Sequence, residues 1–295
     1  MDLLQAVILG IVQGLTEFIP ISSTGHLVIA SRLTNLYDGN PEQLTATMAV
    51  IQLGTLAAVF VYFATDIVNI TVAFTRDHIA WLSGRKNNFS GTNGIRPIWL
   101  SDDAWLGWLI VAGSIPVAII GLLFKEEIEG SLTKNLWIVA SMLVIVGLLM
   151  GLAEMVGSQR KNIKQLGVMD ALIVGLSQVL ALLPGASRSG STIMGGLFAG
   201  LKRDTAARFS FLLMIPAITA SGLLELYEAV EILPPESLTS LLVGTAVAGV
   251  VGYLAIWFLL AFLKKYSTAV FIVYRIILGG ILAYLLYAGI ISPQG

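Results

Sequence analysis

Two short polar stretches in a largely apolar chain carry the residue types that could perform chemistry. The first, beginning at Gln13, reads QGLTEFIPISSTGH, and the second, beginning at Gln178, reads QVLALLPGASRSGS. Aligned without gaps, they also place Ser22 on Ser187. In each stretch proline and glycine would end an apolar helix, and Ser or Thr could cap the helix that follows. Each stretch is therefore predicted to be two half-helices that meet at a polar tip.

The first tip offers oxygen atoms that suit a hard cation. Gln13 and Glu17 are four residues apart, so they share one face of a helix. Together they could provide ligands for Mg²⁺ or Ca²⁺. A carboxylate within an apolar membrane segment is costly, which favours a functional role for Glu17. The alternative is a structural carboxylate that is hydrogen-bonded to the backbone of the tip.

The first tip also carries hydroxyl groups and an imidazole. Ser22, Ser23 and Thr24 lie where a helix should begin, and Ser22 is the expected N-cap. His26 follows Ser23 by three residues, so their side chains could be neighbours. A hydroxyl group beside an imidazole is the minimal activated nucleophile. Acid–base chemistry at neutral pH would fall to His26 or to a perturbed Glu17.

The second tip has the features of an anion site. It combines a guanidinium, several hydroxyl groups and the start of a helix near Gly190. Backbone N–H groups at a helix start and an arginine fork both suit a phosphate. The side chains of this tip are Ser187, Arg188, Ser189, Ser191 and Thr192. The alternative for Arg188 is an internal ion pair with Glu17, since buried charges are usually paired.

The composition indicates a polytopic membrane protein. The chain has 295 residues, of which 56% are hydrophobic and 12% charged, with a mean hydropathy of +0.86. Soluble domains carry about 25% charged residues. Cysteine is absent from the sequence, which excludes disulfides and thiolate metal sites. The N-terminus has no basic region before its apolar run, so a cleaved signal peptide is not expected.

The apolar runs predict one transmembrane domain over residues 1–295, with two repeats at about 1–154 and 165–288. Six runs have the roughly 20 residues that cross a bilayer: Thr45–Ala64, Ala104–Phe124, Leu136–Glu154, Ala206–Tyr227, Leu238–Leu263 and Thr268–Ala288. The broken segments Leu3–Leu33 and Val168–Leu201 are predicted to be re-entrant hairpins. The fold class is thus an all-α polytopic membrane protein with two inverted repeats, each a hairpin plus three spans.

The basic residues predict the orientation in the membrane. Residues 65–103, which are rich in Asn, Ser and Gly after position 86, read as a flexible cytoplasmic connection. Three residues, Arg32, Lys125 and Lys134, fall on the opposite side. Twelve fall on the side of the 65–103 connection: Arg76, Arg85, Lys86, Arg96, Arg160, Lys161, Lys164, Lys202, Arg203, Arg208, Lys264 and Lys265. The positive-inside rule makes the twelve cytoplasmic, and both termini then face outward.

Three further ionisable residues fall within or near the predicted spans. Glu154 and Glu225 lie near span ends, whereas Arg275 lies deeper in its span. Structural pairing of Arg275 with one of these carboxylates is the favoured interpretation.

Four motifs make the chain similar to a known family. QGLTEFIPISSTGH (13–26), AVIQLGTLAAV (49–59), LPGASRSGST (183–192) and FSFLLMIPA (209–217) together resemble the undecaprenyl-diphosphate phosphatases of the bacitracin-resistance type. The resemblance covers nearly the whole chain. It implies an integral bacterial membrane enzyme that removes the terminal phosphate of a C55 isoprenyl diphosphate and recycles the lipid carrier for cell-wall synthesis.

The resemblance also implies roles for individual residues. In that family the first acidic position accepts Glu or Gln and the second is Glu, and these positions are Gln13 and Glu17 here. Catalysis is implied for Glu17, Ser23, His26 and Arg188, and contact with the substrate phosphates for Ser22, Thr24, Ser187, Arg188, Ser189 and Thr192. A divalent cation, Mg²⁺ or Ca²⁺, is implied at Gln13 and Glu17. The site is expected to face the outer, periplasmic side of the plasma membrane.

Several alternatives stay open from the sequence. The nucleophile could be Ser23, His26 or an activated water. Lipid phosphatases that use two histidines are rejected, because the second histidine, His78, falls in the cytoplasmic connection. Inverted repeats with broken helices also occur in transporters, so a lipid-phosphate flippase or an anion transporter is the alternative function. The expected partners are the lipid substrate and the bilayer, with a homodimer compatible with the sequence and no nucleic acid.

Overall fold

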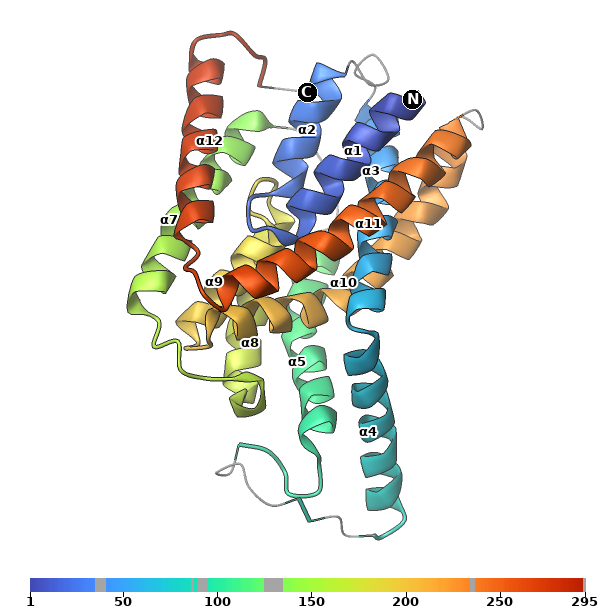
Figure 1. Cartoon of the computed structure of the whole chain (residues 1–295), viewed down its shortest axis with the longest axis vertical. Coiled ribbons are helices and arrows are strands. Elements are labelled where there is room, and N and C mark those ends of the chain that lie inside the picture. Colours follow the sequence, from blue (N-terminus) through green and yellow to red (C-terminus); the bar gives the residue numbers. More distant parts are fainter. Residues whose placement is uncertain (35–40, 86–87, 90–94, 125–134, 234–236, 294–295) are drawn as a thin grey trace.

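The computed structural model describes residues 1–34, 41–85, 88–89, 95–124, 135–233 and 237–293, and their regular structure is helical (Figure 1). Two short 3₁₀ turns, Ile163–Gln165 and Leu180–Leu182, accompany the α-helices. The α-helices are α1 Leu3–Phe18, α2 Ser23–Leu33, α3 Pro41–Tyr62, α4 Ala64–Leu82, α5 Asp102–Leu123, α7 Leu136–Val156, α8 Val168–Val179, α9 Arg188–Phe198, α10 Arg203–Ile232, α11 Leu238–Leu263 and α12 Ala269–Tyr287.

The expected all-α membrane fold is confirmed. Among the described residues, six helices are long and apolar enough to cross a bilayer, and they match the predicted spans to within a few residues. They are Gln43–Tyr62, Asp102–Leu123, Leu136–Val156, Arg203–Leu224, Leu238–Leu263 and Ala269–Tyr287. The two broken segments form the helix pairs α1–α2 and α8–α9, each of which turns back at its tip (Figure 1).

Each hairpin breaks where proline restricts the backbone. Ile19 ends α1 in an extended conformation (φ −66°, ψ 133°), as expected for a residue that precedes proline. In the second hairpin, Gly185 adopts φ +89° directly after Pro184. With 16 residues in α1 and 12 in α8, neither helix reaches across a hydrocarbon core of about 30 Å. The two tips therefore end within the protein.

The hairpins pack on spans from the other half of the chain. Helix α1 lies along α11, and α8 lies along α5. The contacts are backbone to backbone: Gly10 lies against Gly244, and Gly175 lies against Gly113, so a side chain at any of these positions would collide with the neighbouring helix. Gly10 and Gly175 are equivalent in the gapless alignment. Two related repeats would be expected to pack in this way, with the hairpin of each half on a span of the other half. The inverted orientation of the two repeats stays a prediction.

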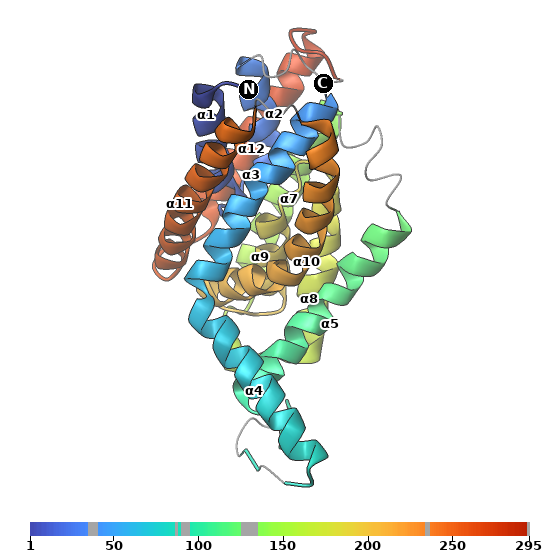
Figure 2. The same ribbon diagram turned by 90° about the vertical axis from the view of Figure 1, so that its right-hand side faces the viewer.

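The first part of the connection over residues 65–103 is helical, whereas the Asn- and Gly-rich part that indicated flexibility lies mostly outside the described residues. The helical part continues from α3 as α4, which projects beyond the other helices at the end opposite both termini (Figures 1 and 2). Its charged residues interrupt any long apolar run, so the apolar pattern did not predict α4. The helix nevertheless packs on the protein: Ala73 is buried, and Ile70 and Phe74 pack over Gly107 of α5. Lys86, Asn87, Ser90, Gly91 and Gly94 lie outside the described residues.

Other predicted loop charges also lie outside the described part of the chain. These are Lys125, Lys134 and Glu236, together with the side chains of Arg32, Glu225, Glu228 and Glu231. The predicted orientation of the loops stays a prediction throughout the chain.

A buried carboxylate joins α4 to the start of α5. Asp77 is 1% exposed, and its Oδ2 accepts hydrogen bonds from the Ser101 backbone N (2.7 Å) and Oγ (2.6 Å). Ser101 is the N-cap of α5. Burial alone would raise the pKa of Asp77, but hydrogen bonds from Ser101 and Arg76 outweigh it and hold the pKa below its ordinary value. The ionised carboxylate therefore stabilises this corner at neutral pH.

We expect Asp77→Ala to lower the stability of the protein by about 2 kcal/mol, because two hydrogen bonds to a buried charged group are lost. The measurement is the thermal midpoint of unfolding in detergent. Asp103→Ala, which removes an exposed carboxylate from the first turn of the same α5, is the matched control and should shift the midpoint far less. Equal midpoints for the two variants would contradict this role of Asp77.

The same contact predicts the direction of the pH dependence. A carboxylate with a depressed pKa stabilises the folded state above its unfolded pKa, and this contribution is lost as the pH falls through the folded value. The difference in midpoint between wild type and Asp77→Ala should therefore persist at neutral pH and shrink under acidic conditions.

Candidate active site

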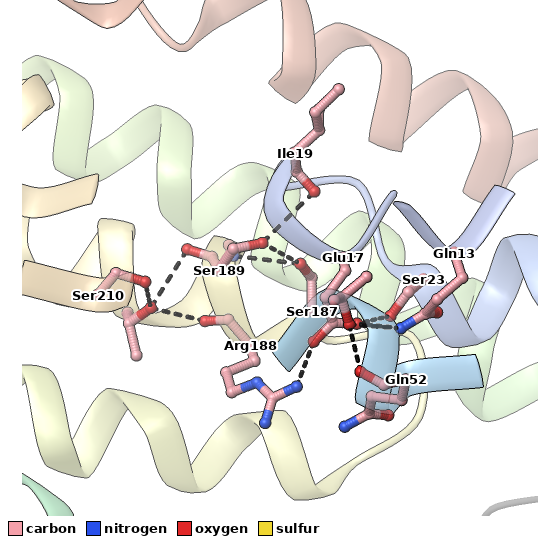
Figure 3. Close-up of polar contacts among 12 residues, drawn as sticks. Gln13, Glu17, Ile19, Ser23, Gln52, Ser187, Arg188, Ser189 and Ser210 are labelled. Carbon is pink, nitrogen blue, oxygen red and sulfur yellow. Dashed lines mark hydrogen bonds and ion pairs between the residues drawn. The ribbon is translucent and has the colours of Figure 1, made fainter. Parts of the chain in front are cut away.

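The two tips meet in an ion pair between opposite halves of the chain. Arg188 Nη2, at the start of α9, donates to Glu17 Oε1, near the end of α1 (Figure 3). The side chain of Glu17 is 3% exposed and that of Arg188 is 20% exposed. Since the partners are 171 residues apart in sequence, only the packing of the two hairpins can bring them together. The alternative that Arg188 pairs with Glu17 is therefore realised in this structure.

The second oxygen of Glu17 accepts from two other side chains. Ser23 Oγ donates to Glu17 Oε2 over 2.9 Å, and Gln13 Nε2 donates to the same atom over 3.1 Å. Gln13 Nε2 also lies 3.4 Å from Thr55 Oγ1 of α3, and Thr55 in turn donates to the carbonyl of Gln52 (Figure 3). The carboxylate is thus surrounded by donors from α1, α2 and α9. Ser23, whose hydroxyl faces Glu17, is the nearest candidate nucleophile.

The first tip offers part of a cation site. Gln13 Oε1 is buried and has no hydrogen-bond partner among the described residues, although an unpaired acceptor is costly in such a place. It belongs to the side chain that contacts Glu17. No group of three or more His, Cys, Asp or Glu side chains lies together in the described part of the chain. A hard cation would fit Gln13 and Glu17 only if substrate oxygens or water completed its ligands.

Both tips begin their second helix in the same strained conformation. Ser22 and Ser187 have φ values of 78° and 69°, in the left-handed region that disfavours residues other than glycine. Ser22 Oγ accepts from the Gly25 backbone N (3.4 Å), and Ser187 Oγ accepts from the Gly190 backbone N (3.1 Å). The predicted N-cap at Ser22 is confirmed, and α9 begins two residues before the predicted Gly190. Strain at equivalent positions is typical of functional turns.

The hydroxyl groups predicted at the second tip divide into two sets. Ser187 and Ser189 lie at the tip, with 3.2 Å between their hydroxyl oxygens, and Ser189 Oγ lies 3.4 Å from the carbonyl oxygen of Ile19 in the first tip. Thr192 instead points away from the ion pair. Its fully buried hydroxyl donates to the Arg188 carbonyl over 2.7 Å and lies 2.5 Å from Ser210 Oγ of α10. Thr192 therefore holds the first turn of α9.

The structure separates His26 from Ser23. His26 Nδ1 lies 2.7 Å from the Ser22 carbonyl oxygen, and Nε2 lies 2.6 Å from the Tyr274 hydroxyl of α12. The two rings are stacked with 5.6 Å between centroids. The predicted Ser23–His26 contact is therefore replaced by two separate contacts, one to Glu17 and one to Tyr274. Thr24, the other predicted hydroxyl of this tip, is exposed.

The favoured pairing of Arg275 with a carboxylate is not found for Glu154. Arg275 is 0% exposed, and among the described residues its guanidinium donates to five backbone carbonyl groups. Glu154 instead pairs with Arg203 and accepts from Thr268. The side chain of Glu225 lies outside the described residues. Apolar depth alone did not distinguish a carboxylate partner from a set of carbonyl partners, because both satisfy a buried guanidinium.

Sequence reasoning also missed three polar side chains around the tips. Thr55 and Ser210 support Gln13 and Thr192, and Tyr274 contacts His26. A signal was present for the first two, because Thr55 lies within AVIQLGTLAAV and Ser210 within FSFLLMIPA. Tyr274 lies in an ordinary apolar span, so its position offered no comparable signal.

Comparison with known proteins shows the family of the chain. Residues 6–281 match the family described as bacitracin resistance protein BacA. A protein of Syntrophobacter fumaroxidans named undecaprenyl-diphosphatase is 47% identical over 97% of this chain and 98% of its own length. Proteins of the same name from Chlorobium chlorochromatii and Mycolicibacterium vanbaalenii are each 45% identical over 99% of this chain, and over 100% and 99% of their own lengths. The chain belongs to the bacitracin resistance protein BacA family.

Proposed function

We propose that this protein hydrolyses the terminal phosphate of undecaprenyl diphosphate and yields undecaprenyl phosphate and inorganic phosphate. The name shared by its relatives supports this activity. The observation that carries it is the Glu17–Arg188 contact, in which a carboxylate and a guanidinium from the two tips meet within a membrane domain. The lipid tail would lie among the spans while the diphosphate reaches the tips, so the chain acts as a membrane hydrolase.

The second tip supplies the phosphate cradle in this proposal. Arg188 Nε is buried without a hydrogen-bond partner among the described residues, so the guanidinium has a donor left for an incoming anion. The first backbone N–H groups of α9 and the hydroxyl groups of Ser187 and Ser189 add further donors. Ser22 and Thr24 would contact the phosphates from the first tip, and Thr192 would hold the cradle's first turn. A bound phosphate would replace Glu17 as the partner of Arg188.

The geometry supports Ser23 as the attacking group. Ser23 Oγ would form a bond to the terminal phosphorus while the bridging P–O bond breaks and its electron pair leaves with undecaprenyl phosphate. The hydroxyl proton would pass to Glu17 Oε2, which lies 2.9 Å from Ser23 Oγ. Water then hydrolyses the phosphoserine and releases inorganic phosphate. The alternatives are direct attack on phosphorus by His26 or by water. If His26 does not attack, it would act as an acid or a base near the tip.

The proposed cofactor is a divalent cation, Mg²⁺ or Ca²⁺. Glu17 and the unpartnered Oε1 of Gln13 would hold it, and substrate oxygens would complete its ligands. When bound, such a cation neutralises charge on the phosphoryl group.

The protein is a multi-pass membrane protein, and we propose that it resides in the bacterial plasma membrane with its site open to the outer side. The excess of Lys and Arg in the segments on one side supports this orientation. Both termini also lie at the end opposite the α4–α5 corner (Figure 1). Exposed apolar side chains along α5 and α12 would face lipid or a second copy of the chain.

The alternative function, a lipid-phosphate flippase or anion transporter, is not favoured by the comparisons. Phosphate release from undecaprenyl diphosphate in detergent separates the two functions, because detergent leaves no second compartment. A protein that only moves its substrate would release no phosphate there, and that outcome would overturn the proposed function.

We expect Arg188→Ala to lower kcat for phosphate release by about a hundredfold to a thousandfold, as removal of one stabiliser of transition-state charge typically does. Arg203→Ala is the matched control. It removes an arginine at the start of α10 that is ion-paired with Glu154, and its kcat should stay near that of the wild type. Near-normal turnover in Arg188→Ala would mean that the phosphate cradle is misassigned.

Ser23 is expected to carry the phosphoryl group during turnover. Rapid quenching with substrate labelled in its terminal phosphate should recover the label on Ser23, and Ser23→Ala should lose both the label and most of the turnover. Ser31→Ala removes a hydroxyl from the same helix, where Ser31 donates to the Val28 carbonyl, and should keep both. Label on His26 would show that the histidine attacks phosphorus instead.

Chelation of divalent cations should abolish phosphate release, and Mg²⁺ or Ca²⁺ should restore it. Gln13→Glu adds a carboxylate ligand and should lower the half-activating cation concentration by about tenfold, since ligand charge tunes affinity for such ions. Asp103→Asn, which removes an exposed carboxylate far from the tips, serves as the control. Full activity in chelator would remove the cation from the mechanism.

A further inference from the structure

We propose that Arg275 is a positioning residue that sets the separation of Glu17 and Arg188 by binding the backbone of both tips at once. The inference rests on the proposed function, because the pair that Arg275 positions is the one assigned to phosphate hydrolysis. Arg275 lies on α12, outside both hairpins, and among the described residues it forms no hydrogen bond with the side chain of either member of the pair. Its effect would therefore act through the backbone.

All three guanidinium nitrogens of Arg275 donate to carbonyl oxygens of other elements. Nη1 donates to Pro20 of the first tip over 3.2 Å. Nη2 lies 3.0 Å and 2.9 Å from the carbonyl oxygens of Gly185 and Ala186 in the second tip. Nη2 and Nε also reach Met142 and Leu143 of α7, over 3.1 Å and 3.2 Å. One fully buried side chain thus joins both tips to a transmembrane helix.

The two tip contacts are equivalent in the repeats. Pro20 and Gly185 occupy the same position when Gln13 is aligned on Gln178. Each lies two residues before the serine that caps the second helix of its hairpin. A single guanidinium therefore binds the corresponding carbonyl in each hairpin, so it fixes the tips relative to each other as well as to α7.

Arg275 is the tip-to-tip link that substrate leaves in place. The Glu17–Arg188 pair must open when a phosphate takes the guanidinium of Arg188. A further hydrogen bond between the described parts of the tips, from Ser189 Oγ to the Ile19 carbonyl, is 3.4 Å long and involves a hydroxyl that the substrate would also attract. The bonds from Arg275 lie beneath the tips and use only backbone oxygens, so they persist while the site is occupied.

The charge of Arg275 also favours an anion in the cradle. Its Nη1 would lie 3.1 Å from a Cβ atom at Gly190, which places the guanidinium directly against the first turn of α9. The N-terminus of a helix carries a partial positive charge. A cation there is unfavourable until a negative group arrives, and no carboxylate contacts Arg275 among the described residues. A bound phosphate would relieve this repulsion.

The test is a double-mutant cycle on kcat, with Arg275→Lys and Arg188→Lys measured singly and together. Lysine keeps the charge but cannot reach carbonyls in several directions. Misplacement by about 1 Å can cost a hundredfold, so we expect Arg275→Lys to lower kcat by about that factor while KM changes by less than about threefold. If Arg275 acts by placing Arg188, the double variant should lose much less than the product of the single losses.

Arg203→Met is the matched control for a merely structural effect. It breaks the partly buried ion pair of Arg203 with Glu154, the residue of α7 that also accepts from Thr268, without touching either tip. Arg203→Met should lower kcat only slightly, and in the double variant with Arg188→Lys the two fold-losses should multiply. Two outcomes would overturn the positioning role. In the first, the fold-losses in kcat of Arg275→Lys and Arg188→Lys also multiply in the double variant. In the second, Arg275→Lys and Arg203→Met lower stability and kcat equally.

A second variant removes no hydrogen-bond donor or acceptor. Gly190→Ala adds a methyl group 3.1 Å from Nη1 of Arg275 and 3.2 Å from Cβ of Ser187, so it displaces the guanidinium and the cap of α9 by a few tenths of an ångström. Alanine favours the helix, so the protein should retain its thermal midpoint while kcat falls by about tenfold. Unchanged kcat in a stably folded Gly190→Ala protein would contradict the inference. A wild-type protein that releases no phosphate would overturn the proposed function, whereas an active wild type with a multiplicative cycle overturns only the role of Arg275.

Discussion

The ion pair of Glu17 and Arg188 joins the two hairpins at their tips and places a buried carboxylate beside a guanidinium. Charges that leave water carry a desolvation cost of several kcal/mol each, and a direct partner offsets only part of it. The chain supplies the remainder with Ser23 and Gln13, which donate to the second carboxylate oxygen. Arg188 keeps one buried donor without a partner among the described residues. The pair is therefore well held on its acidic side and prepared for an anion on its basic side.

The hairpins that carry this pair are permitted because other helices enclose their tips. Backbone that is not helical must find its hydrogen bonds within the protein at membrane depth. The caps at Ser22 and Ser187 satisfy N–H groups, and Arg275 satisfies carbonyl groups of both tips. Close glycine contacts such as Gly175 on Gly113 then bring the hairpins against spans of the other half. Positioning of the site and stability of the fold thus rely on the same contacts.

These contacts also explain why a membrane setting suits hydrolysis of a lipid diphosphate. In the proposed function, the substrate's charged end must enter a region that is otherwise apolar, and the tips would offer it a guanidinium, a helix start and several hydroxyl groups. Electrostatic stabilisation of this kind is most effective where water is scarce. A soluble enzyme would first have to extract the isoprenyl tail from the bilayer. Spans with exposed apolar side chains would allow the tail to remain in the hydrocarbon of the bilayer.

The six spans, the two hairpins and the polar residues at their tips could all be predicted from the amino-acid sequence. Length, apolar composition and Pro–Gly breaks are local properties, so they could be read in order along the chain. Tertiary structure alone decided the partners. It turned Ser23 toward Glu17 and His26 toward Tyr274, and it gave Arg275 carbonyl groups instead of a carboxylate. These partners depend on which helices pack together, and that packing cannot be inferred from residue type and spacing alone.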